Sequence, residues 1–128
     1  MLFRSRAPLP VPAFEMALAG IGVFPPRGRP RACWLGVDPG GDAVRRVARA
    51  VHDRLRAAGL PEAADEFHPH VTLARVRRPG SLRAATLRLA APAAPSPAMR
   101  VDAITLFESR LVPPPVTYVP VARVPLSA

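Results

Sequence analysis

Hydrophobic and polar positions along the chain follow two periodicities, which predict short strands around one main helix. Apolar residues alternate with others from Phe14 to Leu18, as in a half-buried strand. The apolar run 32–37 is typical of a central strand. Two further strands are predicted over 100–107 and 117–124, and Pro120 places the second of them at a sheet edge or a bulge.

A period of 3.6 residues predicts one strong helix from Asp42 to Ala58. Asp42 is a suitable N-cap, and Gly59 stands where a glycine commonly ends a helix. His52 lies at the edge of the apolar stripe and is interpreted as a boundary residue. The stripe itself consists of Val44, Val47, Ala48, Val51, Leu55 and Ala58.

The order of these elements, strands followed by a helix and then more strands, predicts an α+β fold. Proline-rich residues 1–12 are expected to form a flexible lead-in. We expect residues 13–128 to form a single domain, with a shorter helix over 81–89 and an alanine-proline linker over 90–97.

Composition narrows the class of protein. The chain has 128 residues, which fits one small domain, and a formal net charge of +9. All eighteen basic residues are arginine, a bias that a GC-rich coding sequence explains. The positive charge therefore has two equally weighted interpretations: a surface that attracts RNA, or a generic solubilising surface. The single cysteine, Cys33, is expected to be a buried small hydrophobe. Without a secretory pattern or a long apolar run, the expectation is a cytoplasmic protein that does not bind membranes.

The stretch Phe67–Arg75 carries the candidate chemistry. Side chains of a strand alternate faces, so His70 and Thr72 are predicted to share one face while Val71 points into a core with Leu73. The same alternation puts Arg75 on the opposite face, with a side chain long enough to reach around the strand end. A lone His-x-Thr is common, and a strand histidine is more often structural than catalytic.

The residues around this tripeptide make the pattern more specific. Phe67–Arg75 resembles the second signature of the 2H phosphoesterase superfamily, most closely that of the RNA 2',3'-cyclic phosphodiesterases, also called the 2'-5' RNA ligase or LigT-like family. Further segments, in matching order, are similar to that family over about residues 14–126. They are 20–25, 29–31, 34–37, 101–111 and 118–126.

This resemblance implies a LigT-like fold of antiparallel sheets with helices packed outside, and a hydrolase that acts on RNA ends bearing a 2',3'-cyclic phosphate. It assigns acid/base catalysis to His70 and a hydrogen bond to phosphate to Thr72. Arg75 is a candidate substrate-binding residue, with an ion pair to a neighbouring carboxylate as the equal alternative, and His68 is a weaker candidate. No metal or cofactor is expected.

Family members carry two His-x-Thr motifs, one in each lobe, whereas this sequence contains one. We therefore expect an incomplete first lobe and low or absent activity. One imidazole cannot both activate water and protonate the leaving oxygen on the opposite side of phosphorus. Two alternatives stay open: a non-catalytic module that binds RNA phosphate, or a dimer that completes the site, although monomers are implied by the family.

Overall fold

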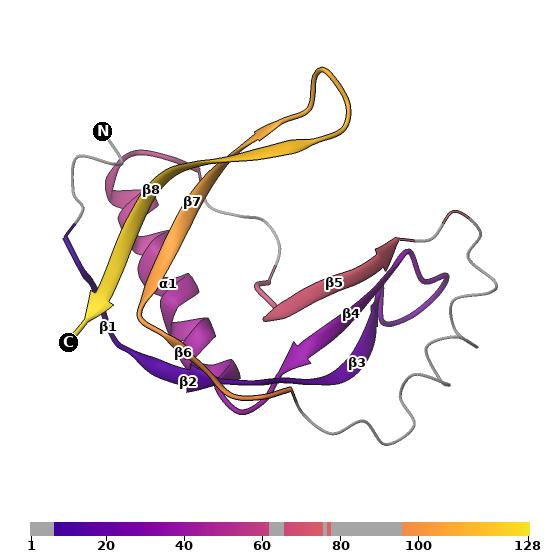
Figure 1. Cartoon of the computed structure of the whole chain (residues 1–128), viewed down its shortest axis with the longest axis horizontal. Helices are drawn as coiled ribbons and strands as arrows, with labels where there is room; N and C mark the ends of the chain where they lie inside the picture. The colour runs from indigo at the N-terminus through magenta and orange to yellow at the C-terminus, as the bar shows by residue number, and fades with distance from the viewer. Residues whose placement is uncertain (1–6, 62–65, 76, 78–95) are drawn as a thin grey trace. The chain divides into compact units, whose positions relative to one another are not determined.

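A computed structural model of the chain describes residues 7–61, 66–75, 77 and 96–128. The predicted helix over 81–89 and most of the predicted linker over 90–97 lie outside these residues. The elements run β1 (Leu9–Pro12), β2 (Phe14–Met16), β3 (Leu18–Phe24), β4 (Ala32–Val37), α1 (Gly41–Ala57), β5 (His70–Arg75), β6 (Met99–Val101), β7 (Ala103–Arg110) and β8 (Thr117–Ser127). This is the predicted α+β fold (Figure 1).

The chain forms two compact units. The first contains residues 1–14, 46–66 and 100–128, and the second contains residues 15–45 and 67–99. The short strands β2 and β6 pair with each other, and both include residues where the chain passes from one unit to the other. The single domain expected over 13–128 stays a prediction.

The first unit contains a three-stranded sheet in the order β1-β8-β7. β7 and β8 form a long antiparallel hairpin, and β1 lies parallel to β8 (Figure 1). Leu106 pairs with Ala122 but Phe107 pairs with Pro120, so Val121 is the extra residue of a bulge. Of the two alternatives predicted from Pro120, the bulge is confirmed and the sheet edge is wrong, because β8 is the central strand of this sheet.

The lead-in expected over residues 1–12 is not loose in its second half. Leu9 and Val11 of β1 are only 1% and 5% exposed. They belong to a buried cluster with Val47 of α1 and with Val124 and Leu126 of β8. The prolines keep this segment extended. Because side chains alternate along the strand, one face of β1 is buried. The expectation of a flexible, poorly packed lead-in was therefore wrong for β1.

Helix α1 begins one residue earlier than predicted. The amide of Val44 donates to the Gly40 carbonyl at 3.0 Å, so Gly40 rather than Asp42 occupies the cap position. Asp42 instead lies in the first turn, where its carboxylate suits the helix dipole and pairs with Arg45 at 3.1 Å.

The C-terminal end of α1 confirms the role predicted for Gly59. This glycine has a φ of 82°, in the left-handed region. Its amide donates to the Arg56 carbonyl at 2.9 Å, and the Leu60 amide donates to the Leu55 carbonyl at 3.1 Å. These two bonds satisfy carbonyls that the end of the helix would otherwise leave unpaired.

Among the described residues, no helix is long and apolar enough to cross a membrane.

The second unit contains an antiparallel sheet in the order β3-β4-β5 (Figure 1). Cys33 on the central strand β4 is 2% exposed, which confirms its expected burial. Gly22 of β3 lies opposite Trp34 of β4, and a Cβ atom at Gly22 would overlap the indole ring. The absence of a side chain at Gly22 therefore lets the Trp34 ring lie flat against β3.

Replacing Leu9 tests whether β1 is part of the core. Leu9→Ala should lower the free energy of unfolding by about 2–5 kcal/mol, because the substitution leaves a cavity in a cluster that is closed to solvent. Urea unfolding followed by circular dichroism measures this loss. Val121→Ala is the matched control: Val121 is 47% exposed on β8, so its truncation should cost less than about 1 kcal/mol. Equal losses from the two variants would contradict the burial of β1.

Candidate active site on strand β5

The candidate site is built on β5, which pairs with β4 in a ladder whose register shifts once. Thr72 lies opposite Trp34, whereas Ala74 lies opposite Cys33. Two residues of β5 therefore advance against one residue of β4, and Leu73 is the extra residue of a β-bulge. Bulges of this kind redirect the side chains that follow them.

The bulge changes the face on which Arg75 lies. Residues paired across antiparallel strands share a face, and so do residues two apart on a regular strand. Thr72 pairs with Trp34 and Arg75 pairs with Ala32, two positions along β4 from Trp34. Arg75 therefore lies on the same face as Thr72 and His70. The simple alternation that placed Arg75 on the opposite face was wrong, because it did not include the bulge.

The imidazole of His70 is held by the backbone two residues before it. Its Nδ1 lies 2.5 Å from the carbonyl oxygen of His68. Since a carbonyl oxygen only accepts hydrogen bonds, Nδ1 carries the proton and donates it. In the neutral ring, Nε2 therefore holds the lone pair. Because His70 is exposed, this nitrogen is available to take a proton from, or return one to, a group outside the protein.

Four rings pack together on this face of the second unit. The Phe24 ring lies edge-on to the His70 ring, and their centroids are 5.0 Å apart. The centroid of Phe24 is also 5.1 Å from that of Trp34. His68 is half-buried and meets the Trp34 ring edge-on at 4.6 Å, and its own centroid is 6.3 Å from that of His70. Edge-to-face contacts of this kind limit the orientations of each ring. The cluster thus supports the imidazole of His70 from one side.

The opposite face of β5 is not buried as predicted. Val71 and Leu73 are 43% and 49% exposed, and every residue of β5 is exposed. In the described part of the chain β5 is the edge of its sheet, so burial of these side chains would need a further layer. The expected apolar floor beneath His70 and Thr72 is instead supplied on their own face by Trp34 and Phe24.

The predicted site residues thus separate into three exposed groups and one partly buried group. His70, Thr72 and Arg75 share a face and are all exposed, whereas His68 packs into the ring cluster. Among the described residues, no carboxylate forms an ion pair with Arg75. A proton carrier, a hydroxyl and a guanidinium on one surface are suited to binding an anion.

Sequence reasoning missed Phe24 and Trp34 as parts of this site. The sequence has few aromatic residues, which argued against any ring platform. A signal was present in Gly22 and Trp34, a small and a large residue on two predicted strands. Their pairing requires the register of β3 on β4, which local patterns do not set.

Comparison with known proteins places the chain in a family. The model of the 2'-5' RNA ligase superfamily matches residues 5–112. The chain belongs to this superfamily, as the resemblance of the Phe67–Arg75 stretch predicted.

Two curated relatives are named RNA 2',3'-cyclic phosphodiesterase. The protein from Aeropyrum pernix is 44% identical over 64 residues, and the protein from Archaeoglobus fulgidus is 37% identical over 65 residues. These matches cover 50% and 51% of this chain but only 36% of each relative. The matched segments therefore span about half of this chain and about a third of each relative.

Solved structures share the fold at lower identity. A structure from Thermus thermophilus superposes with a TM-score of 0.67 at 24% identity, covering 98% of this chain and 66% of that protein. Escherichia coli LigT, solved in complex with 3'-AMP, superposes with a TM-score of 0.67 at 21% identity, covering 93% of this chain and 63% of LigT. At this level of identity the similarity establishes the LigT-like fold.

The hydrogen bond to His70 makes a prediction about its tautomer. In its neutral form, His70 should carry its proton on Nδ1, because the His68 carbonyl accepts it. Long-range proton-nitrogen NMR spectra distinguish the two tautomers by their nitrogen shifts. His52 on α1 provides an internal reference. A proton on Nε2 of His70 would show that the bond to the His68 carbonyl does not form in solution.

Proposed function

We propose that this chain supplies one half of the acid/base pair that hydrolyses RNA 2',3'-cyclic phosphate ends to 2'-phosphomonoesters. One observation carries the proposal: His70, Thr72 and Arg75 lie on one exposed face of β5, and the Nδ1 bond of His70 leaves Nε2 for proton transfer. The names of the curated relatives support the same reaction.

The reaction needs two proton transfers on opposite sides of phosphorus. The oxygen of water forms a bond to phosphorus and loses a proton, while the bond from phosphorus to the ribose O3' breaks and that oxygen gains a proton. The phosphate stays on O2'. His70 Nε2 has the chemistry for either transfer, as the base when neutral or as the acid when protonated.

Thr72 and Arg75 are proposed to bind the phosphoryl oxygens during this displacement. A hydroxyl donates one hydrogen bond, and a guanidinium donates two in a planar arrangement that matches two oxygens of a phosphate. Positive charge near these oxygens stabilises the negative charge that develops on them in the transition state. Both side chains are exposed, so neither needs to be uncovered before substrate binds.

His68 is proposed to act through position rather than through a proton. Its ring is half-buried against Trp34, and its backbone carbonyl holds His70. The sequence contains one His-x-Thr, so the group that handles the second proton is not assigned to any residue of this chain. We therefore expect the isolated chain to bind a nucleotide phosphate but to hydrolyse the cyclic substrate slowly.

Two measurements on the same variants test the proposal: hydrolysis of 2',3'-cyclic CMP and calorimetric binding of 2'-CMP. Wild-type turnover should be slow, and His70→Ala should reduce it by roughly 100-fold or more, because a general acid or base contributes about that much. Arg75→Gln and Thr72→Val should weaken 2'-CMP binding by roughly 10-fold or more, as loss of a hydrogen bond to a charged group does.

Arg123→Gln is the matched control for Arg75→Gln. Arg123 is an exposed strand arginine of the first unit and pairs with Asp102 at 3.2 Å, so its loss removes the same charge from another surface. Thr72→Ser keeps the hydroxyl and should retain binding. If Arg75→Gln binds 2'-CMP as well as Arg123→Gln does, the phosphate site is not on this face. Phosphate binding that survives His70→Ala, with no turnover in the wild type, would favour the non-catalytic module.

A dimer that completes the site is a second candidate, and the edge position of β5 favours it. In the described part of the chain β5 has one free edge, with Val71 and Leu73 exposed beside it, and such edges accept strands from another chain. Light scattering across a concentration series should then show a dimer in the wild type, and Val71→Lys should shift it toward monomer. A monomer at all concentrations would exclude this candidate.

A further inference from the structure

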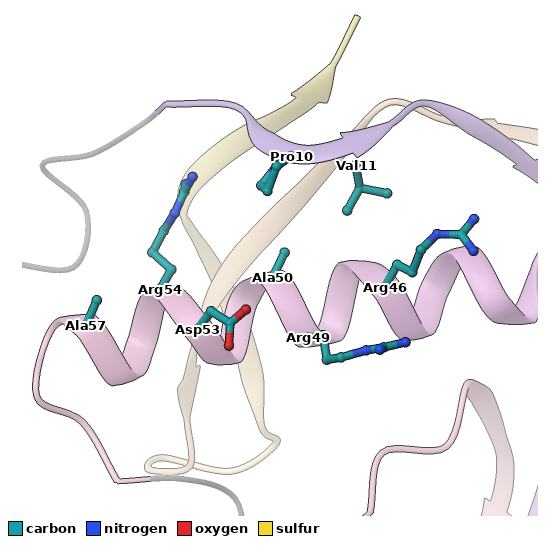
Figure 2. A pocket seen from close by; sticks show the side chains of 8 residues that line it. All are labelled: Pro10, Val11, Arg46, Arg49, Ala50, Asp53, Arg54 and Ala57. Atoms are coloured by element: carbon teal, nitrogen blue, oxygen red, sulfur yellow. The ribbon is translucent and has the colours of Figure 1, made fainter.

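A groove of about 580 Å³ lies between strand β1 and helix α1 in the first unit. Pro10 and Val11 face the helix from β1, and Ala50 lies beneath them on α1 (Figure 2). All of the residues that line the groove belong to the first unit, so the groove shares no residue with the face of β5. They are Pro10, Val11, Arg46, Arg49, Ala50, Asp53, Arg54 and Ala57.

The groove combines an apolar floor with a charged border. Its floor is formed by proline, valine and alanine side chains, and arginines of α1 stand around it (Figure 2). Arg54 donates to the carbonyls of Ala7 and Pro8 at 2.8 and 3.2 Å, which ties the start of β1 to the helix. The two walls of the groove are therefore held together by Arg54 and by the buried cluster beneath them.

Arginines on α1 differ in how their charge is balanced. Arg45, outside the groove, pairs with Asp42 at 3.1 Å. The carboxylate of Asp53, which lies in the groove, is paired with Arg56 at 3.3 Å. No ion pair to Arg46 or Arg49 forms among the described residues. In the described part of the chain, the groove thus presents two exposed guanidinium groups that form no ion pair, beside an apolar surface.

We propose that this groove binds the backbone of single-stranded RNA. The choice of RNA as the ligand rests on the proposed function. The groove would add a second RNA contact to the one proposed on the face of β5. Guanidinium groups bind phosphates through paired hydrogen bonds, and the apolar floor suits the face of a sugar or base. Arg46 and Arg49 are about one turn of helix apart, with about 5–6 Å between Cβ atoms at this spacing, so both side chains can reach the backbone of one RNA strand.

Salt dependence of RNA binding tests the groove. The probe is a labelled single-stranded RNA with an ordinary 3'-hydroxyl end, which does not need the chemistry at His70. Arg46→Gln/Arg49→Gln should weaken binding and reduce the slope of log K against log salt by about 1.4, because each lost phosphate contact on a single strand removes about 0.7. Fluorescence anisotropy at several salt concentrations measures both quantities.

Arg45→Gln/Arg110→Gln is the matched control. It also removes two exposed arginines, but each is paired with a carboxylate outside the groove. This control should keep nearly the wild-type slope. A second pair of variants tests the groove by adding a negative charge at Ala57, which lies at the exposed end of the groove. Ala57→Glu should weaken RNA binding, whereas Ala57→Gln, which adds no charge, should not.

The outcomes separate this proposal from the proposed function. If the groove binds RNA, His70→Ala should bind the probe as wild type does, while the Arg46/Arg49 variant should still bind 2'-CMP normally. Equal slopes for the Arg46/Arg49 variant and its control would overturn the groove proposal and leave the chemistry at His70 untouched. Absence of RNA binding by the wild type at low salt would overturn it as well.

Discussion

The pairing of β5 with β4 is the constraint on which the candidate site depends. Backbone hydrogen bonds set the register, and the register places one extra residue at Leu73. If β5 kept all of its residues but paired without the bulge, His70 and Thr72 would still share a face, but Arg75 would lie on the other face of the sheet. One inserted position therefore determines whether the guanidinium and the imidazole are available to the same anion.

A second constraint acts beneath the imidazole. The Trp34 ring needs the open backbone of Gly22 in order to lie against β3, and the rings of Phe24 and His68 pack around it. The carbonyl of His68 then fixes which nitrogen of His70 carries the proton. Packing and hydrogen bonding thus restrict the ring of His70, although every residue of β5 is exposed.

Charge is distributed unevenly in the first unit as well. The chain carries a formal net charge of +9, but charge alone does not identify a binding surface. On α1, Arg45 and Arg56 form ion pairs, whereas among the described residues Arg46 and Arg49 beside the groove form none. Such a difference between neighbouring arginines distinguishes a candidate contact from a uniformly solvated helix face. RNA is the polyanion that we propose as the ligand of both surfaces.

Local patterns in the sequence determined the strand at 32–37, the helix and its glycine end, the proline bulge in β8 and the His-x-Thr motif, because each depends on neighbouring residues alone. Tertiary structure decided the burial of β1, the face of Arg75 and the ring cluster around Trp34. Each of these depends on which strands pair and in what register, and side-chain alternation within one strand carries no information about its partner.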